Sequence, residues 1–174
     1  MRVDGTVACW GVPTSYDVPP QGTFASVSVG SSFACGVRMD GTVTCWNQFN
    51  GPGITSPPGG DAAAFASISA GVGFVCGVKA DSTLECWGSN NYGESTPPVG
   101  TFASVGAGNQ YACGIKTDGT IACWGDDNYG RATPPAGTFT TIATGYEFAC
   151  GIRTDGTVAC WGNNSMGQAT PPAR

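Results

Sequence analysis

A Cys-Trp dipeptide recurs five times along this chain of 174 residues, and the other recurring residues repeat in step with it. It stands at 9–10, 45–46, 86–87, 123–124 and 160–161, in steps of 36, 41, 37 and 37 residues, and it contains all five tryptophans. A fixed period of this length is typical of repeat architectures, in which each unit buries its apolar face against the next. We therefore expect a row of similar units.

The repeats cover almost the whole chain, which we treat as a single repeat domain over 1–174. The units are a half repeat at 1–22 and full repeats at 23–63, 64–100, 101–137 and 138–174. A four-residue insertion near 59–62 accounts for the longer step. Since 1–22 holds only the second half of a repeat, two hypotheses stand: a piece of a longer propeller, or copies that join end to end through open edges.

Within a repeat, apolar residues alternate and turn residues bound each run, which predicts β-strands and no helix. The clearest unit is a hairpin of Phe33–Arg38 and Thr42–Trp46 around the Met39-Asp40-Gly41 turn. Its register places Cys35 opposite Cys45 in a pair with close side chains. Both faces carry apolar groups, so neighbouring sheets should cover both. That requirement predicts an all-β protein of small antiparallel sheets, either a β-propeller or a β-solenoid.

Eight of the nine cysteines form pairs ten residues apart, which favours four cross-strand disulfides. Free buried thiols and a metal site are the alternatives, but zinc ligands usually lie 2–4 residues apart and the chain has no His. Disulfides would indicate a secreted or extracellular, oxidising location, although the chain shows no signal peptide. Cys9 is left over, either unpaired or bonded to another chain. The expected pairs are Cys35–Cys45, Cys76–Cys86, Cys113–Cys123 and Cys150–Cys160.

The core C-G-V-K-x-D-G-T-V-x-C-W-G-x-N-x-Y-G, preceded by F-A-S-V-x-A-G, resembles the regulator-of-chromosome-condensation repeat family. The short repeats are similar to those of secreted bacterial members. The resemblance implies a β-propeller that presents loops to protein partners. Members usually have seven repeats, whereas this chain has about four and a half, which implies an open or incomplete ring for a single chain.

Composition excludes several functions. With 7 Lys+Arg against 12 Asp+Glu, the net charge is −5, which argues against nucleic-acid binding. The absence of His removes Ser-His-Asp and Cys-His catalysis, and no apolar run approaches the ~18 residues of a membrane helix. Asp126-Asp127-Asn128 lacks the spaced ligands of a calcium loop. We expect no metal, no cofactor and no enzyme activity.

The segments that vary between repeats are the candidate binding loops, because binding residues concentrate on loops of rigid scaffolds. Tyr92, Tyr129 and Met166 share one repeat position, where packing between units and partner contact are both open. Asn163 begins a glycosylation sequon. We predict a non-enzymatic extracellular scaffold for a protein or glycan partner; the alternative is a structural protein that assembles head to tail into a fibre or ring. The candidate contact residues are Phe49, Tyr92, Asp126, Asp127, Tyr129, Tyr146 and Glu147.

Overall fold

The computed structural model describes residues 1–10, 18–47, 54, 57 and 64–171, which contain four three-stranded antiparallel sheets. Strands follow chain order within every sheet, so consecutive strands are hydrogen-bonded neighbours. The first sheet is β1 (Phe24–Val29), β2 (Phe33–Arg38) and β3 (Val43–Asn47); the second is β4 (Phe65–Ala70), β5 (Phe74–Lys79) and β6 (Leu84–Gly88); the third is β7 (Phe102–Ala107), β8 (Tyr111–Lys116) and β9 (Ile121–Gly125); the fourth is β10 (Phe139–Thr144), β11 (Phe148–Arg153) and β12 (Val158–Gly162). A short 3-10 turn, η2 (Asn128–Gly130), follows β9.

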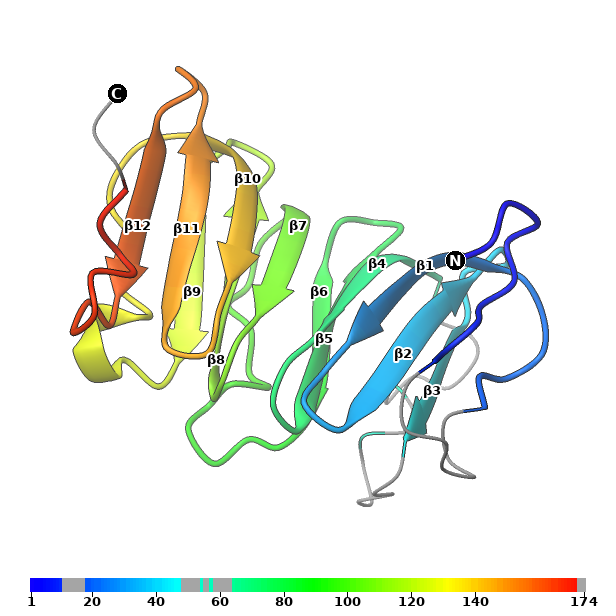
Figure 1. Ribbon diagram of the computed structural model, residues 1–174. Helices are drawn as coiled ribbons and strands as arrows, with labels where there is room; N and C mark the ends of the chain where they lie inside the picture. The colour runs from blue at the N-terminus through cyan, green and yellow to red at the C-terminus, as the bar shows by residue number, and fades with distance from the viewer. Residues whose placement is uncertain (11–17, 48–53, 55–56, 58–63, 172–174) are drawn as a thin grey trace.

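The four sheets stand side by side in one row, with β12 at one end and β3 and the N-terminal segment at the other (Figure 1). The first strands of successive sheets contact each other, from β1 to β4, β4 to β7 and β7 to β10. This arrangement is that of propeller blades, and the row does not close into a ring. The predicted all-β propeller-type fold is confirmed.

Each hairpin has the predicted register. Val37 lies opposite Val43 and Cys35 opposite Cys45, and the turn glycine Gly41 adopts a left-handed φ of 85°. Asp40 accepts hydrogen bonds from the amide (3.0 Å) and the hydroxyl (2.7 Å) of Thr42. The same aspartate–threonine bonds occur in the other hairpins and at Asp4, so the recurrent aspartates stabilise turns.

Four disulfides join the second and third strands of the sheets. The Cα atoms of the bonded cysteines lie 4.0 to 4.1 Å apart, close to the spacing of a non-hydrogen-bonded antiparallel pair. The pairs are those expected from the ten-residue spacing: Cys35–Cys45, Cys76–Cys86, Cys113–Cys123 and Cys150–Cys160.

A β-bulge just after the leading phenylalanine shapes each first strand, for example between Phe24 and Ser26 in β1. The extra residue turns the Phe24 ring onto Gly36, where a Cβ would lie 2.4 Å from the ring, so only glycine fits. The ring also packs against Trp46, with 5.9 Å between centroids. Equivalent pairs occur in the other sheets at 5.6 to 6.3 Å: Phe65–Trp87, Phe102–Trp124 and Phe139–Trp161.

Neighbouring sheets bury their apolar faces against each other, as the two-faced strands predict. Phe33, Cys35 and Val37 of the first sheet share one core cluster with Phe65 and Trp87 of the second. The same arrangement recurs between the second and third sheets and between the third and fourth. The core is therefore a series of similar layers between sheets, as in other repeat proteins.

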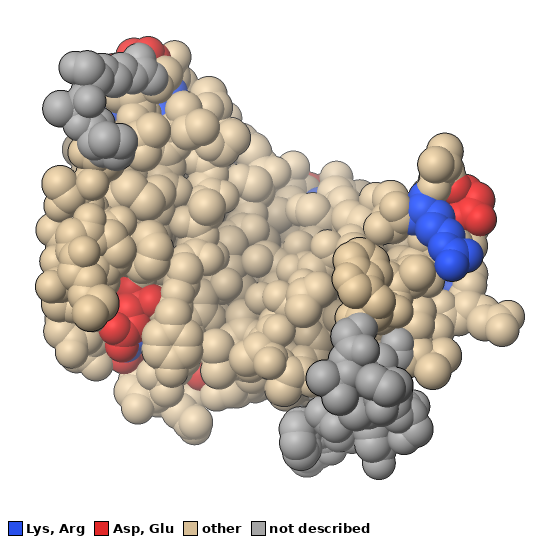
Figure 2. All heavy atoms as spheres, viewed as in Figure 1, with Lys and Arg blue, Asp and Glu red and all other residues tan. Residues whose placement is uncertain are grey.

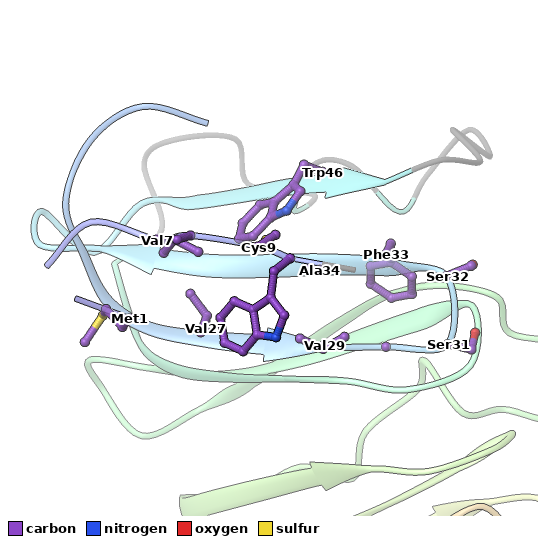
Figure 3. Close-up of a pocket in the computed structure, with 13 residues that line it drawn as sticks. Met1, Val7, Cys9, Val27, Val29, Ser31, Ser32, Phe33, Ala34 and Trp46 are labelled. Atoms are coloured by element: carbon purple, nitrogen blue, oxygen red, sulfur yellow. The ribbon is translucent and has the colours of Figure 1, made fainter. Parts of the chain in front are cut away.

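Segment 1–10 contains a turn and no strand, and it is hydrogen-bonded to the start of the first sheet. The Gly5 carbonyl accepts the Phe24 N–H at 2.9 Å, as the Gly41 carbonyl accepts the Phe65 N–H in the next unit. A pocket of about 520 Å³ remains between this segment and the first sheet (Figure 3). Cys9 borders the pocket, is exposed, and forms no disulfide within the described part of the chain.

Candidate interaction surface

The variable loops meet at one end of the sheets, because the turn between first and second strands lies next to the segment that leaves the third strand. Three backbone hydrogen bonds join them: Ser89 N to Gly73 O at 2.8 Å, Asp126 N to Gln110 O at 2.8 Å, and Asn163 N to Glu147 O at 2.9 Å. We call this end the loop edge. It comprises turns 71–73, 108–110 and 145–147 with segments 89–96, 126–133 and 163–170.

Four large side chains project from the loop edge into solvent. Tyr92, Tyr129 and Met166 occupy the same position in successive units and are 51%, 67% and 92% exposed. Tyr146 joins them from turn 145–147 and is also exposed. The shared position of Tyr92, Tyr129 and Met166 was expected either to pack between sheets or to contact a partner, and these exposures do not support packing between sheets. Exposed aromatic side chains grouped in this way are typical of surfaces that bind partners.

The segments that carry these side chains are internally braced. Asp127 accepts bonds from the Ala132 amide and the Thr133 hydroxyl, both at 2.8 Å. Asn90 and Asn164 accept the equivalent amide bonds in the neighbouring segments, at 3.0 and 2.9 Å. Tyr129 has a left-handed φ of 64°, a conformation that costs a non-glycine residue on the order of 1–3 kcal/mol. The loop edge thus holds its aromatic residues on ordered backbone.

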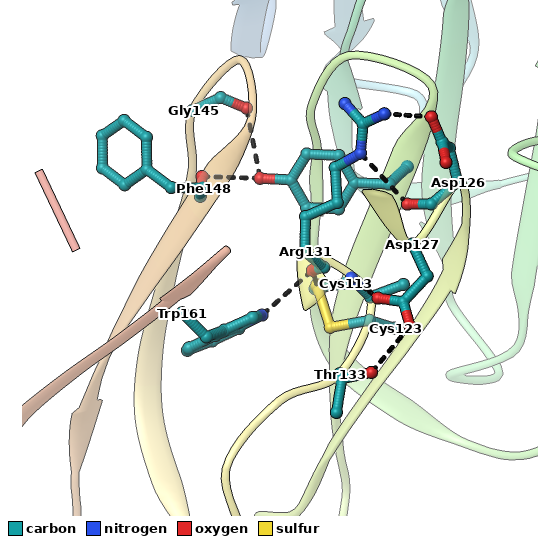
Figure 4. Close-up of a disulfide and its surroundings, with 11 residues drawn as sticks. Cys113, Cys123, Asp126, Asp127, Arg131, Thr133, Gly145, Phe148 and Trp161 are labelled. Atoms are coloured by element: carbon teal, nitrogen blue, oxygen red, sulfur yellow. Dashed lines mark hydrogen bonds and ion pairs between the residues drawn. A yellow bond between two sulfur atoms is a disulfide. The ribbon is translucent and has the colours of Figure 1, made fainter. Parts of the chain in front are cut away.

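A buried polar pair underlies each of two segments, formed by the second and seventh residues after the tryptophan. In the second unit, Glu94 is fully buried and accepts the Ser89 hydroxyl and the Tyr92 amide, both at 2.7 Å. In the third unit, Asp126 forms an ion pair with Arg131, whose side chain is only 4% exposed (Figure 4). Neither pair was predicted, because no short motif links positions five residues apart in a loop.

Arg131 also ties the third unit together. Its guanidinium donates to the carbonyls of Asn109 and Asp126, both at 3.2 Å, and lies 5.8 Å from the centroid of the Tyr111 ring. The Tyr111 hydroxyl donates to the Phe148 carbonyl of the fourth sheet at 2.6 Å (Figure 4). Burial raises the pKa of this phenol above its ordinary value, so it remains a donor.

The predicted contact residues therefore separate into two groups. Tyr92, Tyr129 and Tyr146 are exposed, whereas Asp126 and Asp127 are engaged in internal bonds, and Glu147 accepts the side-chain amide of the sequon residue Asn163 at 2.7 Å. Phe49 lies outside the described residues. Partner binding by all these residues stays a prediction.

Charged side chains are sparse on the face shown in Figure 2, where most of the surface is uncharged. In the described ranges, no group of three or more His, Cys, Asp or Glu residues is arranged to hold a metal ion. The described residues also contain no helix long and apolar enough to cross a membrane.

Solved structures similar to this chain include two plant receptor-kinase ectodomains. The CRINKLY ectodomain of the kinase ACR4 from Arabidopsis thaliana is 35% identical, with a TM-score of 0.68 over 81% of this chain and 50% of that one. The ectodomain of the kinase CR4 from Physcomitrella patens is 28% identical, with a TM-score of 0.68 over 82% of this chain and 39% of that one. This chain thus spans half or less of their lengths.

Yeast RCC1 (Prp20), solved in complex with Kap60, shares the fold with a TM-score of 0.70 and 15% identity, over 89% of this chain and 46% of that one. No protein with a curated description matches the sequence. The family model of the regulator of chromosome condensation (RCC1) repeat matches three times, at residues 65–94, 102–131 and 139–168. Each match begins at the leading phenylalanine of a sheet and ends in the segment at the loop edge. These matches cover more than half of the sequence, and the chain belongs to the RCC1 repeat family.

Proposed function

We propose that this chain is a non-catalytic extracellular scaffold that binds a protein partner through the loop edge. The observation that carries the proposal is the exposure of Tyr92, Tyr129 and Met166 at one repeat position, together with the exposure of Tyr146 in a turn of the same loop edge. Tyrosine and methionine are enriched in protein interfaces, and the braced segments reduce the entropy lost when a partner orders them. Methionine has no hydrogen-bond donor for a sugar, which favours a protein over a glycan.

The extracellular part of the proposal is supported by the four disulfides, which persist in oxidising compartments. The similarity to a receptor-kinase ectodomain at 35% identity is consistent with that location. The non-catalytic part is supported by the roles of the carboxylates: Glu94 and Asp126 are buried in pairs and Asp127 braces its own segment. Each of these carboxylates therefore stabilises its own loop.

The test compares binding by the chain and by two variants. The double variant Tyr129→Ser/Met166→Ser removes two exposed side chains from the loop edge. The control Met39→Ser removes one that is 70% exposed at the opposite end of the first sheet. Binding is measured on parallel arrays of extracellular proteins and of glycans.

We expect the chain and the Met39→Ser control to bind the same proteins, and the double variant to lose at least about tenfold in affinity, the size of a hot-spot effect. Equal binding by all three would refute the loop edge as the site. Binding to glycans alone would replace the protein partner by a sugar.

A further inference from the structure

The loop edge carries an excess of negative charge. Its turns and segments contain four carboxylates and one cation: Glu94, Asp126, Asp127, Glu147 and Arg131. At the opposite end of the sheets, a cation stands two residues before each hairpin-turn aspartate, so the charges there largely balance. Figure 2 shows acidic atoms together where η2 meets the end of β12. A partner of this edge therefore meets an acidic surface.

Two of the carboxylates have no ion-pair partner in the described part of the chain. Asp126 pairs with Arg131. Asp127, in contrast, accepts bonds only from an amide and a hydroxyl of its own segment, and Glu147 accepts one from the side-chain amide of Asn163. Because none of these donors carries a charge, the charges of Asp127 and Glu147 are not neutralised by a neighbour.

The fold does not require a charge at either position. Asn90 and Asn164 occupy the position of Asp127 in the neighbouring units. Each accepts the same backbone amide bond, at 3.0 and 2.9 Å, and each bonds the same threonine hydroxyl, also at 3.0 and 2.9 Å. Glu147 likewise stands where the third unit has the neutral Gln110. Bracing of the loop thus explains the shape of the Asp127 side chain but not its charge, which is available to a partner.

The two charges lie on either side of turn 108–110. Backbone hydrogen bonds join this turn to the segment that contains Asp127, at 2.8 Å, and to the turn that contains Glu147, at 3.3 Å. The same two loops carry the exposed rings of Tyr129 and Tyr146. Carboxylates bind arginine and lysine by charge-assisted hydrogen bonds, and the faces of aromatic rings attract the same cations. The combination therefore suits basic side chains.

An unpaired amide lies between the two charges. The Asn109 side chain is only 8% exposed and makes no hydrogen bond within the described residues, yet its polar atoms are not closed off from solvent as the Ser26 hydroxyl is. Buried polar groups are almost always paired, so an unpaired one needs an explanation. A side-chain amide both donates and accepts, which matches the N–H and C=O groups of a peptide backbone. Asn109 can therefore bind a chain that lies across turn 108–110.

We propose that the partner of the loop edge is a basic protein that presents an extended segment rich in arginine or lysine. Cationic side chains of the segment bind Asp127 and Glu147 and pack on the rings of Tyr129 and Tyr146, and its backbone pairs with the Asn109 amide. Complementary charge of this kind selects the partner and speeds its association. The inference rests on the proposed function, because it assigns a chemical class to the same partner.

The test selects binders from a random library of short displayed peptides and measures their affinity for the chain and its variants. The variant Asp127→Asn/Glu147→Gln removes both charges, and each new side chain already stands at the same position of another unit. Asn109→Val removes the amide in the same way, since valine occupies this position in turn 71–73.

The matched control is Asp81→Asn/Asp118→Asn, which changes the net charge by the same amount at the opposite end of the sheets. Circular dichroism and thermal unfolding check that every variant folds.

We expect the peptides selected by the chain to be enriched in arginine and lysine. The variant Asp127→Asn/Glu147→Gln should bind them at least about tenfold more weakly, whereas the control should bind them as tightly as the chain does. Asn109→Val should also weaken binding. Raising the salt concentration from about 0.1 M to about 1 M should weaken binding to the chain more than to the variant without the two charges, because salt screens exposed charges.

Selected peptides that lack basic residues, a selection that yields no binding peptide, or equal affinity of the chain and Asp127→Asn/Glu147→Gln would overturn this inference. An equal loss in the control would do so as well, since it would show an effect of net charge alone. Unchanged affinity in Asn109→Val would exclude the backbone contact.

Failure of this inference is distinguishable from failure of the proposed function through the variant Tyr129→Ser/Met166→Ser. Neutral peptides that bind this variant more weakly than the chain would refute the basic partner and leave the loop edge as the binding site. Peptides that bind it as tightly as the chain would refute the proposed function itself.

Discussion

Exchanging one buried polar pair for another tests how the third segment of the loop edge is held. Arg131 and Asp126 are 4% and 10% exposed in their side chains, so solvent does not screen either charge. Removing one partner of a buried ion pair typically costs about 3–5 kcal/mol of unfolding free energy. In Asp126→Ser, Arg131 keeps the carbonyls of Asn109 and Asp126 and the Tyr111 ring, so we expect a loss near the lower end, about 3 kcal/mol.

The chain contains its own control for this experiment, because the second unit has Ser89 and Glu94 at the same two positions. Arg131→Glu alone would place two carboxylates together and should cost at least as much as Asp126→Ser. The double variant Asp126→Ser/Arg131→Glu reproduces the second unit and should recover to within about 1 kcal/mol of the original chain.

The assay is urea unfolding followed by tryptophan fluorescence under non-reducing conditions. With a slope of about 2 kcal/mol per molar urea, a loss of 3 kcal/mol lowers the midpoint by roughly 1.5 M. Single variants that each cost less than about 0.5 kcal/mol, or a double variant whose loss equals the sum of the singles, would refute the interpretation that the pair is coupled and buried.

Three further predictions follow from the fold. Gly114→Ala should lower the free energy of unfolding by about 1–3 kcal/mol, because its Cβ would lie 2.6 Å from the Phe102 ring; an unchanged urea midpoint would contradict this. Alkylation of the native protein should modify Cys9 alone, and all nine cysteines after reduction and unfolding; native labelling of further thiols would count against the disulfides. Bonds from Thr120 hold the pKa of Asp118 below 3.8, as equivalent threonines do for Asp4, Asp40 and Asp81. A carboxyl group whose pKa is lower in the folded protein stabilises the fold at pH values above its unfolded pKa, and this stabilisation is lost as the pH falls. The melting temperature should therefore drop between about pH 4 and pH 2, and it should drop less steeply in Asp118→Asn.

The candidate site was predictable in its location and only partly in its residues. Variation between repeats identified the loops after the Cys-Trp dipeptides, and these loops do form one edge with exposed Tyr92 and Tyr129. The variable Asp126 is instead buried in an ion pair. A residue that differs between repeats is not required by the fold that the repeats share. Such differences also arise inside the loops, where one buried polar pair can replace another, so variation alone does not identify exposed contact residues.

The strands, the hairpin register and the cysteine pairing could all be predicted from the order of the residues. These follow from alternation and from a turn of three residues, so they depend on neighbours within about ten positions, such as Cys35 and Cys45. Three features became visible only in the folded chain: the direction in which Phe24 faces after its bulge, the residues that cover the buried tryptophans, and the exposure of Trp10. The burial of the tryptophans could not be predicted because it depends on contacts between sheets, which join residues such as Trp161 and Arg131 that are 30 positions apart. A repeat pattern shows that such a position recurs, but not which surface it meets.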